Sequence, residues 1–194
     1  MKALLRHAPA LALTTALSIA LPTMASAASL QGVTLPDQVT VEGHSLVLNG
    51  IGLRTKFFFK VYVGGLYLPQ REHSAAQILN SDEPRRVVMH FVRGVSQGQI
   101  CGAWKDGLED NTPQASTEIK KKFDTLCSLM RDVENGQAIT LTYLPGMGTK
   151  VDVAGTTTGT IAGSGFATAL FACFIGSHPP GETFKAALLG EAEK

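Results

Sequence analysis

The sequence predicts a single α+β domain in which a β-sheet is accompanied by a layer of helices. Three observations support this prediction. Runs rich in β-branched and aromatic residues, several of them alternating in period two, occupy residues 30–92 and 138–160. Two amphipathic helical segments separate these runs, over residues 96–110 and 116–134. No linker, repeat or low-complexity segment divides the sequence, so one domain is expected.

Residues 1–27 have the three parts of a secretory signal peptide. Basic Lys2 and Arg6 precede an apolar stretch rich in Ala and Leu, and a small-residue sequence then ends at Ala27. We expect cleavage after Ala27, so that residues 28–194 form a periplasmic or secreted domain. An N-terminal anchor helix that stays attached is the alternative.

The composition excludes several classes of protein. With 44% hydrophobic and 17% charged residues, the chain is typical of a globular protein rather than a disordered or collagen-like one. Loss of the signal peptide removes two of the 17 basic residues and none of the 16 acidic ones, which leaves a nearly neutral mature chain. Such a chain has no general attraction for phosphate backbones or anionic lipid. We expect no nucleic-acid partner and no transmembrane segment after signal removal, and the oligomeric state stays open.

The first third of the mature chain is predicted to be β-structure. A β-hairpin is expected over residues 30–48, followed by a turn at residues 49–52, because the Asn-Gly pair there supplies the positive φ angles of a tight reversal. Residues 54–68 carry the strongest strand signal and are closed by Pro69. Odd-numbered positions of this strand are mostly apolar and are expected to face the core, unless a bulge at Gly64-Gly65 changes the parity.

The remaining elements follow in order. Ser74 is expected to cap a short helix that ends at residue 80, and a strand is expected over residues 85–92. The two amphipathic helices are joined by a short connection around Gln114 and should form an antiparallel hairpin. The last elements are two hairpin strands (138–144 and 150–154), a further segment (155–160), an apolar helix (166–175) and a small helix (181–189).

Three cysteines in an exported protein raise the question of a disulfide. Cys101 and Cys127 lie 13 residues on either side of Gln114, on the apolar stripes of the two helices, and are the candidates for a bridge. The alternative is two buried thiols that lie too far apart. Cys173 is expected to be a buried thiol in the apolar helix. The cysteines and histidines lack zinc-site spacing, so we expect no metal and no cofactor.

No nucleophile or dinucleotide motif stands out in the sequence, and no catalytic residue is assigned. Arg54 is the most informative polar residue, because it follows a glycine-rich turn and opens an aromatic strand. Its guanidinium can hold a carboxylate or an enolate, with the hydroxyl of Tyr62 as a second donor. The alternative is a solvated arginine at a strand end and a tyrosine at a sheet edge.

Five segments of the sequence form a recognisable set: Gly50 to Leu68, Arg86-Val-Val-Met, the helix with Trp104-Lys105, Gly136-Gln-Ala-Ile-Thr-Leu, and Phe174-Ile-Gly176 ahead of Pro179. Together they resemble the chalcone isomerase-like family, most closely its exported bacterial branch. The resemblance covers residues 30–190. It implies an open-faced β-sandwich, a large antiparallel sheet covered by a layer of helices, with a ligand cleft between them.

The family contains isomerases that close a chalcone to a flavanone, and non-catalytic relatives that bind fatty acids. The resemblance implies that Arg54 is the arginine that both groups share. Tyr62 falls where the isomerases have threonine and the fatty-acid binders have tyrosine. The segment that matches the isomerases' catalytic tyrosine and asparagine, residues 87–105, has neither residue type, and Gln99 is nearest to the asparagine. The nearest residues to a late-helix threonine or serine are Ala167 and Thr168.

The sequence therefore predicts a non-catalytic periplasmic or secreted protein that binds a small apolar or fatty-acid-like ligand, with Arg54 and Tyr62 at the polar end of the site. An isomerase of the intramolecular lyase type, using Arg54 as the electrophilic group, is one alternative. A structural or partner-binding envelope protein with a filled cleft is the other.

Overall fold

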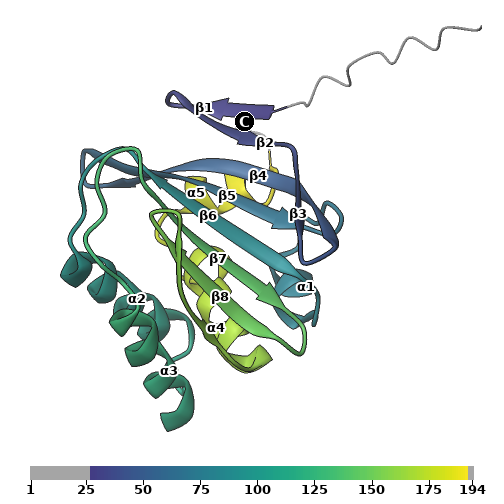
Figure 1. Cartoon of the computed structure of the whole chain (residues 1–194), viewed down its shortest axis with the longest axis vertical. Helices are drawn as coiled ribbons and strands as arrows, with labels where there is room; N and C mark the ends of the chain where they lie inside the picture. Colours follow the sequence, from purple (N-terminus) through teal and green to yellow (C-terminus); the bar gives the residue numbers. More distant parts are fainter. Residues whose placement is uncertain (1–26, 192–194) are drawn as a thin grey trace, which may run out of the picture.

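A seven-stranded antiparallel sheet is the centre of the fold (Figure 1). The computed structural model describes residues 27–191. The sheet has the order β3-β4-β5-β6-β7-β8-β9, so each strand pairs with its neighbours in the sequence, while β1 and β2 form a separate two-stranded ribbon. The strands are β1 (Ala27–Leu30), β2 (Val33–Pro36), β3 (Gln38–Val41), β4 (His44–Lys56), β5 (Phe59–Leu68), β6 (Arg85–Phe91), β7 (Ala138–Leu144), β8 (Gly148–Val153) and β9 (Thr156–Ile161).

Helices pack on one side of this sheet, which confirms the predicted α+β architecture. The most apolar helix, α4, contacts each of the others. Nine of its residues are buried, as expected for a helix that is apolar on all sides. The helices are α1 (Ala75–Asn80), α2 (Gln97–Asn111), α3 (Thr117–Ser128), α4 (Ser164–Ile175) and α5 (Glu182–Leu188). No helix within residues 27–191 combines the length and hydropathy needed to span a bilayer.

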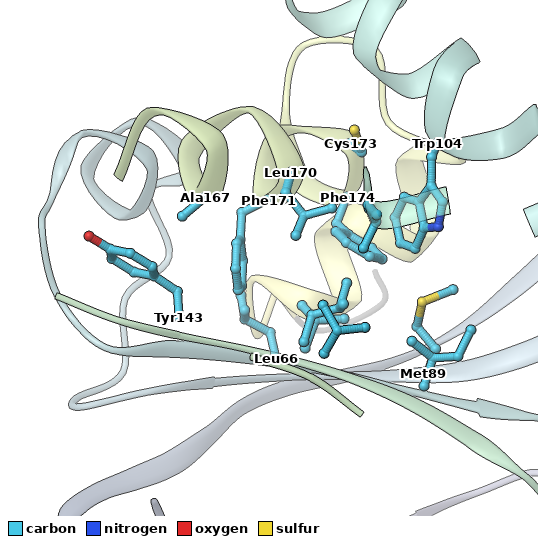
Figure 2. Packing of buried hydrophobic residues seen from close by; sticks show 14 of the residues in the cluster. Leu66, Met89, Trp104, Tyr143, Ala167, Leu170, Phe171, Cys173 and Phe174 are labelled. Atoms are coloured by element: carbon cyan, nitrogen blue, oxygen red, sulfur yellow. The ribbon is translucent and has the colours of Figure 1, made fainter. Parts of the chain in front are cut away.

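Two apolar clusters lie on opposite faces of the sheet. The larger one fills the space between the sheet and the helices, where Leu66 and Met89 face Leu170 and Phe174 (Figure 2). The smaller one lies under the β1–β2 ribbon and includes Tyr67, whose hydroxyl donates to the carbonyl oxygen of Pro36 at 2.9 Å. Strands β4 and β5 are thus covered on both faces.

The predicted strand over residues 54–68 is wrong as a single element. The chain reverses at Phe57-Phe58, so that β4 and β5 form a hairpin. The aromatic run hides this turn, because phenylalanine favours strands and has no turn preference. Phe57 adopts a φ of 55°, which residues other than glycine rarely do.

The predicted turn at residues 49–52 is also wrong, because these residues lie inside β4. A register shift between Leu48 and Gly50 makes Asn49 a bulge. The Asn49 amide donates to the carbonyl of Leu188 at 2.9 Å, which ties the bulge to the end of α5. A Cβ at Gly50 would lie 2.0 Å from the carbonyl oxygen of Ala187. Glycine is therefore required here by the close approach of α5 and not by a reversal of the chain.

The predicted parity of residues 54–68 is wrong for a related reason. The odd-numbered Phe57 and Phe59 are exposed, whereas β5 beyond them is buried on both faces. No bulge occurs at Gly64-Gly65. A Cβ at Gly64 would lie 2.7 Å from the ring of Phe184, and one at Gly65 would lie 2.5 Å from Leu35. The two glycines admit α5 on one face and β2 on the other.

Most other elements form where the sequence predicts them. Ser74 caps α1 as expected, and β6 to β9, α2, α4 and α5 match the predicted order. Of the hairpin predicted over residues 30–48, the part around Glu42-Gly43 joins β3 to β4, while residues 33–36 instead form β2 and pair with β1. The predicted signal peptide, except Ala27, lies outside the described residues.

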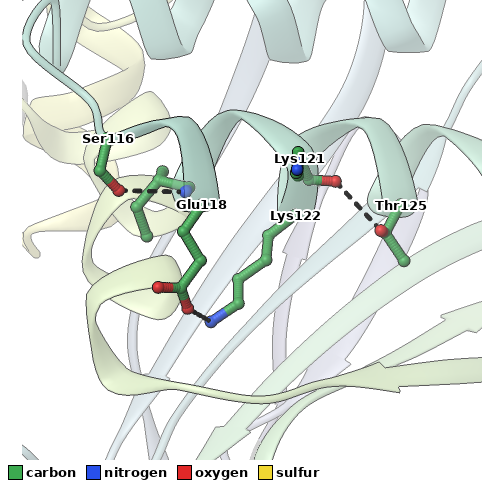
Figure 3. Close-up of polar contacts among 6 residues, drawn as sticks. Ser116, Glu118, Lys121, Lys122 and Thr125 are labelled. Carbon is green, nitrogen blue, oxygen red and sulfur yellow. Dashed lines mark hydrogen bonds and ion pairs between the residues drawn. The ribbon is translucent and has the colours of Figure 1, made fainter.

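Figure 3 shows polar contacts along α3. Ser116 caps the first turn, and Glu118 pairs with Lys122 at 2.6 Å, an i,i+4 ion pair. The helix ends at Ser128, earlier than the predicted residue 134. The apolar periodicity continues past that end because Met130 and Val133 remain buried in non-helical chain.

Candidate ligand-binding cleft

A cleft of about 820 Å³ opens between the sheet and α2. Its walls come from the β4–β5 hairpin, from the end of β6, from one face of α2, and from the end of α4 with residues 178–180. Pockets that enclose small ligands typically have roughly 300–1,000 Å³. The cleft is therefore large enough for a small organic molecule and lies where the sheet meets the helices.

Arg54 and Tyr62, the two residues predicted from the sequence, both line this cleft. They lie opposite each other on β4 and β5, so the hairpin brings them together. They do not lie on one strand, although the sequence predicts that they do. A register shift beside this pair leaves Val61 as an extra residue in β5, which changes the residues that face the helices. Tyr62 is buried, with 7% exposure, whereas Arg54 is half-buried.

Aromatic rings fix the position of Tyr62. The ring centroid of Phe91 lies 5.5 Å away, and Phe184 makes an edge contact at 5.6 Å. Burial raises the pKa of Tyr62 above its ordinary value, and the positive charge of Arg54 offsets this rise only in part. Tyr62 therefore keeps its proton at neutral pH and acts as a hydrogen-bond donor rather than as a base.

Further cations lie at the mouth of the cleft. Lys56 and Arg93 line it together with Arg54. The guanidinium of Arg93 lies over the ring of Phe59, 4.6 Å from its centroid, in a cation–π contact. None of the ion pairs among residues 27–191 involves these three cations. Their charges are therefore available to an anionic group of a ligand.

The inner wall of the cleft is apolar and aromatic. Met89 and Phe91 come from the sheet, and Ile100 and Trp104 come from the buried face of α2. Phe174 of α4 meets Trp104 edge to face, with centroids 5.6 Å apart (Figure 2). Such a wall binds hydrocarbon through the hydrophobic effect.

One polar atom of Trp104 has no hydrogen-bond partner among the described residues. Its side chain is 4% exposed, and the indole N–H has no hydrogen-bond acceptor within the part of the chain that the structure describes. A buried donor without a partner costs about 1–3 kcal/mol. An acceptor atom on a ligand in the cleft would remove this cost.

Cys173 lines the cleft from α4 but lacks the properties of a nucleophile. Burial raises the pKa of its thiol to about 12, and the thiol donates to the carbonyl of Ala169 at 3.3 Å. A Cβ at Gly107 of α2 would lie 3.0 Å from the Cβ of Cys173, so the two helices are in close contact here. The thiol stays protonated and serves packing.

Three other residues considered in the sequence analysis, Gln99, Thr168 and Ala167, differ in whether they line the cleft. Gln99 lines the cleft, but its side-chain oxygen accepts from the backbone N–H of Ser96 at 3.0 Å as part of a capping box. Thr168 lies outside the lining and is 3.3 Å from Arg85 Nη2, with its Oγ1 as acceptor. Ala167 is buried in the core and does not line the cleft.

Cys101 and Cys127 are brought together by the packing of α2 on α3. The Cys101 thiol donates to the Cys127 carbonyl at 3.7 Å. Burial, followed by a hydrogen bond with Cys101, raises the pKa of Cys127 to about 12. Both are thiols in this structure, and a disulfide between them stays a prediction. Within residues 27–191, no group of three His, Cys, Asp or Glu side chains is arranged to hold a metal ion.

Sequence reasoning missed several residues of the cleft. The sequence predicts one continuous strand through Lys56 and Phe59, whereas the two residues flank a turn at the cleft mouth. Arg93 follows the strand predicted over residues 85–92, and its place beside Phe59 depends on the pairing of β5 with β6. Trp104 belongs to a predicted amphipathic helix, and its position in the cleft depends on how α2 packs against the sheet. A signal for this site existed in the clustering of Lys and Arg around the aromatic run.

Comparison with known proteins identifies the family to which this fold belongs. The chain matches a family model described as chalcone isomerase-like over residues 27–190. Among solved structures, it is similar to the crystal structure of a fatty-acid binding protein from Arabidopsis thaliana, with 15% sequence identity and a TM-score of 0.66. That similarity covers 84% of this chain and 96% of the other, and at this identity it shows a shared fold. No curated protein matches the sequence. With the family match extending over nearly all of the described residues, this chain belongs to the chalcone isomerase-like family.

Proposed function

We propose that this protein binds a fatty-acid-like amphiphile in the cleft and does not convert it. The observation that carries the proposal is the cross-strand pair Arg54–Tyr62 at the polar end of a cleft of about 820 Å³ whose inner wall is apolar. We also propose that the mature domain, residues 28–194, is exported to the periplasm, as in the exported bacterial branch of the family. The signal-peptide pattern of residues 1–27 supports this location.

The two ends of the cleft suit the two parts of an amphiphile. Each CH₂ group of a tail buried against Met89, Ile100 and Trp104 contributes about 0.8 kcal/mol. A carboxylate at the other end accepts hydrogen bonds from the Arg54 guanidinium and the Tyr62 hydroxyl, and charge-assisted bonds of this kind are the stronger ones. The fold shared with a protein described as a fatty-acid binding protein supports the same ligand class.

The protonation of Tyr62 and Cys173 argues against turnover by either residue. Cyclisation of a chalcone needs a positioned base or ordered water, together with donors for the developing enolate. Tyr62 and Cys173 keep their protons at neutral pH because burial raises the pKa of both. The amide oxygen of Gln99 is engaged in the helix cap. Arg54 and Tyr62, a cation and a donor beside the apolar wall, hold an anion without activating it.

Native mass spectrometry of the mature protein, purified from its own cell envelope, tests the proposal. We expect a co-purified small molecule that is lost in Arg54→Met. Arg71→Met, which removes an exposed arginine outside the cleft, is the matched control and should retain the molecule. Binding of added lauric acid is measured by the fluorescence of Trp104, the one tryptophan in the sequence.

Two results would overturn the proposal. Chalcone turnover that disappears in Arg54→Ala would show an isomerase instead. A ligand-free protein that also ignores lauric acid, and that is recovered with one specific envelope protein, would indicate a structural or partner-binding role.

A further inference from the structure

The turn between β4 and β5 exposes three consecutive phenylalanines. Phe57, Phe58 and Phe59 are 84%, 96% and 59% exposed. Only one other large apolar side chain among residues 27–191 is exposed to this degree, Met147 at 59%. Contiguous exposed apolar surface of this kind marks an interaction site.

The residue type at the first position of this turn is unusual as well. Gln31, Glu42 and Ala154 have a positive φ at the same position of other hairpin turns, but Phe57, with a φ of 55°, is the aromatic residue among the four. The turn therefore presents bulky rings at a position where a small residue would fit better. Backbone strain retained at an exposed site favours a role in binding.

Cations surround the exposed rings. Lys56 and Lys60 flank them in the sequence, and Arg93 lies over the ring of Phe59. Lys60 donates to the side-chain oxygen of Gln31 at 2.6 Å, which leaves its charge unneutralised. None of the ion pairs in the described part of the chain includes these cations. The mature chain is nearly neutral overall, so this is a local positive patch around an apolar tip.

The tip also adjoins the cleft. Lys56, Phe57 and Phe59 line its mouth, whereas Phe58 does not line it and is the most exposed of the three rings. A surface that takes up the tip would therefore lie directly against the opening of the cleft.

We propose that residues 56–60, which we term the β4–β5 tip, dock on an anionic lipid membrane and hold the cleft mouth against it. Aromatic rings enter the boundary between headgroups and acyl chains, and lysine and arginine bind anionic headgroups. Phenylalanine and arginine are also enriched at protein interfaces, but lysine is depleted there, so the two lysines favour lipid headgroups over a protein partner. Exchange of the ligand between cleft and bilayer rests on the proposed function, whereas the docking itself does not.

Vesicle flotation tests the docking. We expect the mature protein to float with vesicles of equimolar phosphatidylcholine and phosphatidylglycerol, and much less with phosphatidylcholine alone. Phe58→Ser should lower the partition coefficient by about tenfold. Lys60→Glu should lower it by about fivefold or more, and only on the anionic vesicles. Met147→Ser, which removes the other exposed apolar side chain, should leave flotation unchanged.

The variants separate docking from ligand binding. Phe58→Ser and Lys60→Glu change residues outside the cleft lining, so both should keep the fluorescence response of Trp104 to lauric acid, which also shows that they are folded. A wild-type protein that does not float, or a Phe58→Ser variant that floats as well as wild type, would overturn the proposal. So would a concentration-dependent dimer that Phe58→Ser abolishes in the absence of vesicle binding, since the tip would then pair two copies of the chain.

Discussion

Arg54 and Tyr62 lie directly opposite each other on antiparallel strands and face the same cleft. The arginine is half-exposed and the tyrosine is buried, so the pair combines a charge close to solvent with a donor close to the apolar wall. This arrangement distinguishes the polar end of a ligand from its apolar end. The role of the pair can therefore be tested with ligands that differ only in the charge of the headgroup.

The first prediction concerns the headgroup. Wild-type protein should bind lauric acid more tightly than its methyl ester by about tenfold or more, because a hydrogen bond to a charged group contributes about 1.5–3 kcal/mol. Arg54→Met should abolish most of this preference while it leaves the affinity for the ester nearly unchanged. Titrations followed by Trp104 fluorescence measure both ligands. If Arg54→Met lowered the affinity for the acid and for the ester equally, Arg54 would shape the cleft and would not bind the carboxylate.

The second prediction concerns alkaline pH. Burial raises the pKa of Tyr67 from 10.0 to about 12. Because the folded state holds this proton more tightly than the unfolded state, the contribution of Tyr67 to stability is complete below pH 10 and is lost as the pH rises toward about 12. Tyr67→Phe removes the hydrogen bond to Pro36 and should lower the free energy of unfolding by about 1 kcal/mol at neutral pH.

This penalty should shrink at high pH, since the variant has no phenol to ionise. Urea unfolding at about pH 8 and about pH 11 measures it. A penalty that stays constant or grows with pH would contradict the assignment.

The third prediction concerns the contact between α5 and the sheet. Gly64→Ala places a methyl group 2.7 Å from the ring of Phe184 and should destabilise the protein by about 1–3 kcal/mol. Phe184→Leu should restore part of this loss in the double variant. Gly102→Ala in α2, where no atom lies within 4 Å of the added Cβ, is the control and should raise stability by about 0.5–1 kcal/mol. Thermal unfolding compares the variants, and equal effects at both glycines would show that the Phe184 contact is unimportant.

The fourth prediction concerns the cysteines. Because the Cys101 thiol reaches the backbone of Cys127, oxidation should join these two residues and leave Cys173 free. The bridge should stabilise the fold by on the order of 3 kcal/mol. Intact mass of the denatured, unreduced protein should be lower by the mass of two hydrogens in wild type and in Cys173→Ser, but not in Cys101→Ser. A full complement of three thiols in protein from an oxidising compartment would refute the bridge.

Local signals predicted the order of nearly all elements. Ser74 caps its helix and the strand pair β7–β8 forms as alternation indicates, because capping and period-two patterning act between residues close in the sequence. The same signals failed where β-propensity and turn preference conflict with packing. Asn49-Gly50 has the composition of a turn but forms a bulge under α5, and Phe57-Phe58 has the composition of a strand but forms a turn.

The amino-acid sequence is enough to show that Arg54 and Tyr62 lie near an aromatic segment, that an apolar helix follows late in the chain, and that a signal-like segment comes first. The folded chain shows in addition that the two residues lie on different strands, that they share a cleft with Trp104, and that three phenylalanines are exposed to solvent. These features depend on strand register and packing, which local sequence patterns do not fix. The fit of Phe184 over Gly64 and the bulge at Asn49, which is bonded to Leu188, involve residues far apart in the sequence, and together with the Val61 bulge inside the hairpin they set the faces of β4 and β5.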